Sequence, residues 1–190
     1  MDLDRNELLR SQAFLQNTLD HYDGFNRSVK SFLKISKDQG LFQGQILGPL
    51  ANLFQVDKKY ELAMSVALGY ALQNIVVAND SQVKDMIRLL KDRSLGRVTF
   101  LPLNRYGAYR ISGKAPKESI GYARDFISCD DSLKNLFHQL LGDILFVESY
   151  DDGLFLSRNY RKKLSVLKET SFTPKGQLQG DPSKRALSKS

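Results

Sequence analysis

Cysteine, histidine and long apolar runs are scarce in this 190-residue chain, and each scarcity excludes a class of protein. The single cysteine, Cys129, has no second cysteine for an internal disulfide, which indicates a reducing compartment. No stretch of about 18 consecutive apolar residues is present, so no membrane-spanning helix is predicted. The start of the sequence has neither the basic cluster nor the apolar run of a signal peptide, so none is expected.

The sequence also lacks the spacings that enzymes and metal sites use. His21 and His138 lie far apart and neither is near a cysteine, so no zinc-binding pattern exists. There is no Walker phosphate loop, no Gly-x-Gly-x-x-Gly and no Gly-x-Ser-x-Gly. We interpret the histidines as structural or solvated, Cys129 as a structural thiol, and the pairs 130–131 and 151–152 as helix caps. We therefore expect no catalytic residue, no metal and no cofactor.

The composition is that of a globular protein, with 42% hydrophobic and 26% charged residues. The length fits one medium domain or two small lobes that share a core. The formal net charge of +7 lies in residues 156–190, which contain nine basic and two acidic residues. This excess suggests an anionic partner, and nucleic acid is the first candidate. The alternative is a solvated basic face that only keeps the protein soluble.

A seven-residue repeat of large apolar side chains marks the first part of the chain. Leu8, Leu15, Tyr22 and Val29 occupy this repeat, which is typical of a coiled-coil seam. We predict a helix over residues 1–35 that forms the end of a coiled-coil arm. The alternative is an ordinary amphipathic helix that packs on its own domain.

The next part of the chain alternates between strand and helix patterns. Residues 79–81 are Asn, Asp and Ser, which commonly cap a following helix. Gly69 either permits close packing inside its helix or marks the end of that helix. The predicted elements are a strand within 39–50, a helix over 58–72, a strand over 74–78, a helix over 82–91 and a strand over 97–102.

The second half repeats this order. A helix is predicted over 133–142, a strand over 143–147, a helix ending near 163 and a strand over 164–167. Helix, strand, helix and strand therefore occur twice, roughly 70 residues apart. We predict an α/β fold with mixed sheets and two pseudo-symmetric lobes. The predicted boundaries are a coiled-coil helix at 1–35, lobe 1 at 36–103, a linker at 104–119, lobe 2 at 120–182 and a polar tail at 183–190.

Several motifs follow one another along the chain in an order that a known family shares. The most specific match is Lys59-Tyr60-Glu61-Leu62-Ala63, then Ala67-Leu68-Gly69, then Asn74-Ile75-Val76-Val77. Gly96-Arg97-Val98-Thr99-Phe100-Leu101-Pro102 continues this match. The ordered set resembles the hinge domain of SMC (structural maintenance of chromosomes) proteins, and the resemblance covers about residues 20–185. The closing segment departs from the family, because Lys175 and Asp181 stand where glycine is common. This departure bears on how closely interface strands approach each other.

The resemblance implies a dimerisation module that joins the two arms of a long coiled coil in a chromosome-organising ATPase. It implies that residues 1–35 are the end of one arm, that 120–182 include an interface strand, and that 183–190 start the returning coiled coil. The implied partner is a second SMC hinge, with a homodimer favoured over a heterodimer and no membrane. The implied location is the cytoplasm, at the chromosome or nucleoid, or the nucleus of a eukaryote. The implied dimer-interface residues are Lys175, Gly176, Leu178 and Gly180. Candidate contacts to DNA, without sequence specificity, are Lys30, Lys34, Lys37, Lys184 and Arg185.

Two other functions compete with the hinge interpretation. A stand-alone nucleic-acid-binding α/β module would interleave aromatic and basic residues, but the basic segment contains only Tyr160 and Phe172. A small-molecule-binding α/β domain would need a phosphate loop or a set of converging polar groups, and neither is visible in the sequence.

Overall fold

The computed structural model describes residues 25–110, 113–159, 163–167, 170–172 and 178–180. It divides the chain into two compact units that interleave along the sequence. The first unit comprises residues 1–55, 70–109 and 128–136, and the second comprises 56–69, 110–127 and 137–190. Each unit contains a segment from the other half of the chain. The two units are therefore not two consecutive stretches of sequence.

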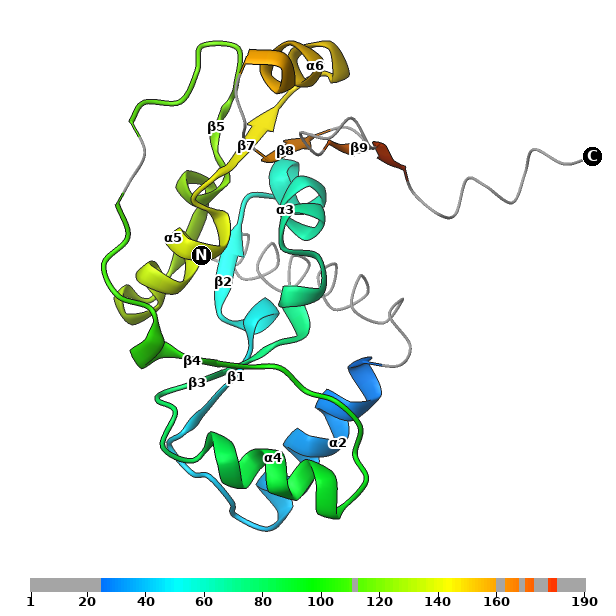
Figure 1. The fold of residues 1–190 in the computed structure, drawn as a ribbon, viewed down its shortest axis with the longest axis vertical. Helices are drawn as coiled ribbons and strands as arrows, with labels where there is room; N and C mark the ends of the chain where they lie inside the picture. Colours follow the sequence, from blue (N-terminus) through cyan, green and yellow to red (C-terminus); the bar gives the residue numbers. More distant parts are fainter. Residues whose placement is uncertain (1–24, 111–112, 160–162, 168–169, 173–177, 181–190) are drawn as a thin grey trace, which may run out of the picture. The chain divides into compact units, whose positions relative to one another are not determined.

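The α/β fold with mixed sheets is confirmed (Figure 1). The α-helices are α2 (Phe25–Asp38), α3 (Glu61–Leu68), α4 (Val83–Asp92), α5 (Lys134–Leu141) and α6 (Tyr150–Asn159). The strands are β1 (Ile46–Pro49), β2 (Phe54–Val56), β3 (Ile75–Val77), β4 (Phe100–Pro102), β5 (Gly121–Tyr122), β6 (Ile127–Cys129), β7 (Ile144–Val147), β8 (Lys163–Val166), β9 (Thr170–Phe172) and β10 (Leu178–Gly180). Short 3-10 helices, including η2 (Lys58–Tyr60), η3 (Gly69–Gln73), η4 (Leu103–Arg105), η5 (Ala123–Phe126) and η6 (Asp131–Leu133), connect them.

The first unit has a three-stranded sheet in the order β1-β3-β4. The β1 and β3 strands are antiparallel, whereas β3 and β4 are parallel and joined by α4. Helices α2 and α4 cover the face that carries Ile75 and Val77, and Figure 1 shows them side by side. Phe32 of α2 is fully buried there, with its ring 5.3 Å from that of Phe100. This aromatic packing fixes α2 on the sheet.

The second unit has a five-stranded sheet in the order β10-β9-β8-β7-β5. Leu164 and Val166 of β8 point to the face that α6 covers through Leu156. Ser165, between them, points to the opposite face, where its Oγ donates to Ala63 O of α3 over 2.9 Å. Helix α3 thus packs on this sheet although it comes from the first half of the chain.

A shared strand pattern confirms the predicted repeat. In the first sheet an antiparallel pair, β1 and β3, precedes a parallel pair, β3 and β4. In the second sheet β5 and β7 are antiparallel, and β7 and β8 are parallel with α6 between them. Strand β4 therefore occupies the position in its sheet that β8 occupies in the other.

Several sequence predictions are corrected in detail. The helix expected over 58–72 is α-helical only in α3, because Gly69 takes a positive φ of 51° and ends it. The N-cap of α4 is Gln82, without a side-chain bond, and Asp80 bonds elsewhere. The cap predicted at Asp130 is confirmed, since its carboxylate accepts from Ser132 N over 2.9 Å. Of the helix predicted over 1–35, residues 1–24 lie outside the described residues.

Candidate interaction surfaces

The first candidate surface is the outer edge of the five-stranded sheet. Leu178 and Gly180 lie in β10, where they pair with Phe172 and Thr170 of β9. Strand β10 ends the sheet, so its second edge has no neighbouring strand within the described part of the chain. Lys175 and Gly176, also predicted at the interface, lie outside the described residues. Two of the four predicted interface residues are thus located in an edge strand.

The second candidate surface is the outer edge of β4 in the three-stranded sheet. Ile75 N donates to Thr99 O over 2.9 Å, which fixes the alternation of main-chain groups along β4. The N–H and C=O of Leu101 face β3, and those of Phe100 point outward. The outward N–H is missing at Pro102, a residue that sheets tolerate at an edge. No described strand pairs with this side of β4, here called its free edge, where Phe100 presents an outward N–H and C=O.

The strands β4 and β8, which occupy equivalent positions in the two sheets, differ in what lies beside them. Strand β8 continues its sheet into β9 and β10, whereas the equivalent strand β4 has no further neighbour among the described strands. An exposed edge invites pairing with another strand unless it is short, charged or covered. Among the described strands, the three-stranded sheet therefore has no counterpart of β9.

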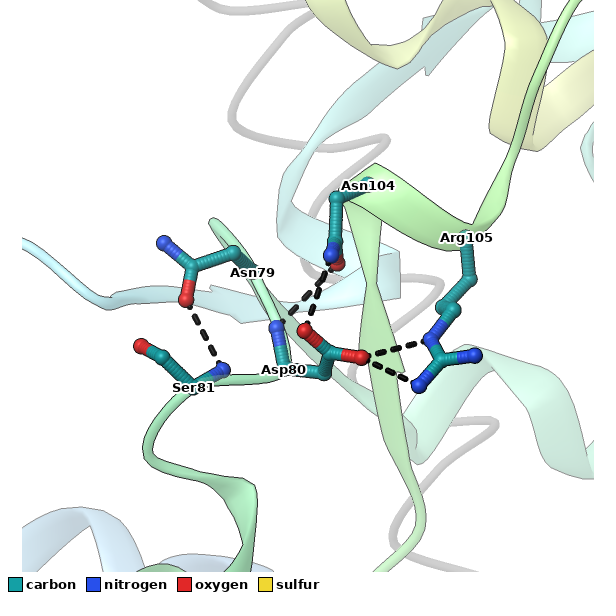
Figure 2. A network of polar contacts seen from close by, with 5 residues as sticks. All are labelled: Asn79, Asp80, Ser81, Asn104 and Arg105. Atoms are coloured by element: carbon teal, nitrogen blue, oxygen red, sulfur yellow. Dashed lines mark hydrogen bonds and ion pairs between the residues drawn. The ribbon is translucent and has the colours of Figure 1, made fainter.

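A polar network joins the ends of β3 and β4, as Figure 2 shows. Asp80 N donates to Asn104 Oδ1 over 3.1 Å, and Asn104 Nδ2 donates to Asp80 Oδ1 over 2.8 Å. Arg105 Nε donates to Asp80 Oδ2 over 2.6 Å, and Nη2 of the same guanidinium contacts that oxygen. The hydrogen bonds from Asn104, followed by those from Arg105, lower the pKa of Asp80 from its ordinary value. The carboxylate therefore stays ionised at neutral pH.

The third candidate surface is basic and lies on α2 and α4. Helix α2 exposes Lys30, Lys34 and Lys37, the three candidate DNA contacts that the sequence predicted on this segment. The α4 region adds a set of exposed basic residues that the sequence analysis missed: Lys84, Arg88, Lys91, Arg93 and Arg97. Residues 25–38 and 82–97 together hold nine basic and three acidic side chains. Lys184 and Arg185 lie outside the described residues.

A signal for the α4 residues was present in the sequence. Lys84, Arg88 and Lys91 repeat the spacing of Lys30, Lys34 and Lys37, four residues and then three. That spacing places all three side chains on one helix face. The net charge of the sequence indicated residues 156–190 instead, because the whole formal excess of +7 lies there.

Metal-binding side chains do not gather in the part of the chain that the structure describes. No group of three or more His, Cys, Asp or Glu side chains there could hold a metal ion. Cys129 is half-buried, and burial raises the pKa of its thiol, which disfavours the reactive thiolate. Within the same residues no helix is long and apolar enough to cross a membrane.

Comparison with known proteins agrees with this architecture. Residues 42–157 match the model of the SMC proteins flexible hinge domain. The chain belongs to the SMC hinge family. The hinge domain of Geobacillus stearothermophilus SMC, solved as an asymmetric dimer, superposes with a TM-score of 0.73 at 28% identity and covers 95% of this chain and 75% of that one. The Pyrococcus furiosus SMC hinge superposes with a TM-score of 0.69 at 27% identity, over 92% of this chain and 90% of that one.

The chromosome partition proteins that match this chain are much longer than it. The chromosome partition protein Smc of Desulfitobacterium hafniense is 33% identical over 172 residues, which are 87% of this chain and 14% of that protein. The corresponding protein of Pyrococcus furiosus is 40% identical over 112 residues, 58% of this chain and 9% of that protein. This chain thus corresponds to a small part of the proteins that it resembles.

Proposed function

We propose that this chain is the dimerisation hinge of an SMC protein and that it joins two coiled-coil arms. The observation that carries the proposal is the free edge of β4, in a sheet whose repeat-related counterpart is extended by β9 and β10. Two related hinges support it: one was solved as an asymmetric dimer and another carries an extended coiled coil. In this proposal a second copy supplies the missing strand.

The partner strand in this proposal is β10 with the residues that precede it. Main-chain hydrogen bonds between β4 of one hinge and β10 of the other would satisfy groups on both free edges. Gly176 and Gly180 fit this role, because glycine lets a second backbone come close. Lys175 and Leu178 flank them in the sequence. A symmetric homodimer would form two such pairings, and a heterodimer with a related hinge is the alternative.

The solution mass tests the proposal. Light scattering at micromolar concentration should give close to twice the chain mass of 21.6 kDa. Replacing Gly176 and Gly180 together by valine should yield a folded monomer. The matched control replaces Gly107 and Gly113 by valine, since an added Cβ meets nothing within 4 Å at either position. A dimer that survives the first pair of substitutions would place the interface elsewhere.

The whole protein has a role in chromosome condensation, cohesion or segregation in this proposal. The relatives that support it are named chromosome partition proteins. The hinge itself is proposed to be non-catalytic, with the ATPase heads in other parts of the protein. Its proposed location is the cytoplasm, in association with the chromosome or nucleoid, or the nucleus if the source is a eukaryote.

A second proposed function is DNA contact by the basic surface on α2 and α4. Lys34, Lys37, Lys84 and Lys91 are exposed on the two helices that pack together in the first unit. Contacts of these residues with phosphates would be independent of sequence and sensitive to salt. Lys184 and Arg185 remain proposed members of the same surface.

A titration with double-stranded DNA at low salt tests this second function. Reversing Lys34, Lys37, Lys84 and Lys91 to glutamate should weaken binding and lower its dependence on salt while the dimer persists. The matched control reverses Lys58, Lys114, Lys117 and Lys163, four exposed lysines of the second unit. Equal losses from both sets would indicate only an effect of net charge, and the basic face would then serve solubility.

A further inference from the structure

We propose that Asp80, Asn104 and Arg105 form a strand-end clip that positions the free edge of β4 for the second hinge. This inference rests on the dimerisation proposed above. It assigns a positioning role to three residues that need not touch the partner themselves. Figure 2 shows how the three side chains converge between the end of β3 and the turn after β4.

The need for such a clip follows from the shortness of β4. The strand has three residues, and among the strands that the structure describes it pairs only with β3. The 3-10 helix η4 follows at once, closed by a hydrogen bond from Tyr106 N to Leu103 O over 3.1 Å. Asn104 and Arg105, both in η4, then hold this turn to the loop after β3 through a single residue, Asp80.

The bonding pattern restricts the turn in more than one direction. Asn104 both donates to the Asp80 side chain and accepts from the Asp80 main chain, which fixes its amide plane. The Arg105 guanidinium approaches the other carboxylate oxygen through two nitrogens. Together these contacts hold the outward groups of Phe100 and Pro102 in one arrangement before a partner arrives. A preorganised strand loses less conformational entropy on binding than a mobile one.

The exposure of the clip side chains indicates that they contribute little to the stability of the folded chain. The side chains of Arg105 and Asp80 are 71% and 33% exposed, and ion pairs at such surfaces contribute little to stability. Loss of the clip should therefore change the affinity of the dimer more than the stability of the monomer.

The affinity of the dimer is measured by sedimentation equilibrium of the complete chain. Asn104→Ala and Arg105→Ala should each raise the dissociation constant by roughly tenfold, as expected when binding must also order a strand end. Arg158→Ala is the control, because it removes the same charge from an exposed site in α6 that belongs to none of the candidate surfaces. Urea unfolding at concentrations where each variant is monomeric should give nearly equal midpoints. Dimer affinity equal to that of the wild type in both clip variants would overturn the inference.

A reciprocal exchange tests the geometry directly. Asn104→Asp alone places two carboxylates together and should weaken the dimer. Adding Asp80→Asn restores a donor and acceptor pair with the roles reversed, so the double variant should recover most of the affinity. Failure of this recovery would count against the clip. A wild-type chain that stays monomeric at all concentrations would instead contradict the proposed dimerisation itself.

Discussion

Ser28 Oγ occupies the space that a Cβ atom on Gly96 would need. Helix α2 therefore meets the loop before β4 at a point where a side chain cannot fit. Gly96 also has a φ of 89°, a conformation that other residues rarely adopt. Both features make this glycine a requirement for the packing of α2.

Gly96→Ala should destabilise the protein by about 1–3 kcal/mol, because the added methyl overlaps Ser28 and the backbone is strained. Urea unfolding measures the change. Adding Ser28→Ala should recover part of the loss, since it removes the overlapping oxygen. Gly107→Ala is the control, with nothing within 4 Å of its added Cβ. Equal stability of the Gly96 and Gly107 variants would contradict this account.

Arg124 is predicted to hold the end of α5. Its side chain is 2% exposed, its Nη1 donates to Gly142 O, and its guanidinium lies 4.0 Å from the centre of the Tyr122 ring. Arg124→Ala leaves that carbonyl without its charged donor, so we expect a loss of about 2–3 kcal/mol. Arg124→Lys should recover only part, since an ammonium cannot stack on the ring as a guanidinium does. A fully stable alanine variant would show that the contact is dispensable.

Ser165 is predicted to anchor α3 on β8. The buried hydroxyl bonds to Ala63 O, so Ser165→Ala should cost about 0.5–1.5 kcal/mol in thermal or urea unfolding. The half-buried Ser157 offers a local control, because its Oγ donates to Leu154 O of its own helix over 2.8 Å. Ser157→Ala should cost less than Ser165→Ala. If the two variants lose the same stability, the bond between α3 and β8 has no special weight.

The pH dependence of the clip follows from the lowered pKa of Asp80. Because this pKa is lower in the folded state, its contribution to stability is full above the ordinary value of 3.8 and declines as pH falls below it. The difference in stability between wild type and Asp80→Asn should therefore be constant near neutral pH and shrink in acid. Carboxyl-carbon NMR titration of Asp80 provides the direct check. A midpoint above 3.8 would contradict the assigned hydrogen bonds.

Local patterns predicted the elements whose burial repeats with a simple period. Ile75, Val76 and Val77 form a fully buried strand, as their unbroken apolar run indicated. Strand β5 has two residues and offers no such run. The contact between Ser165 and Ala63 joins residues 102 positions apart, and no local pattern specifies that pairing. The interleaving of the two units, which depends on such distant contacts, could therefore not be predicted from the sequence.

The polar residues of the candidate surfaces show the same limit. Asp80 was predicted to cap a helix, since a short polar run before an apolar period commonly does so. Asn104 was assigned to a linker, and nothing nearby in the sequence connects it to Asp80. The parallel pairing of β3 and β4 brings their ends together, and only then can the two side chains meet.

The interleaving of segments has a consequence for any cut in the chain. A protease that cleaves between residues 109 and 110 would separate the sequence into two fragments, but residues 56–69 of the first fragment belong to the second unit. Residues 128–136 of the second fragment likewise belong to the first unit. Neither fragment carries a complete unit, so the nicked protein should stay associated. Separately expressed fragments should acquire structure only by complementation when mixed.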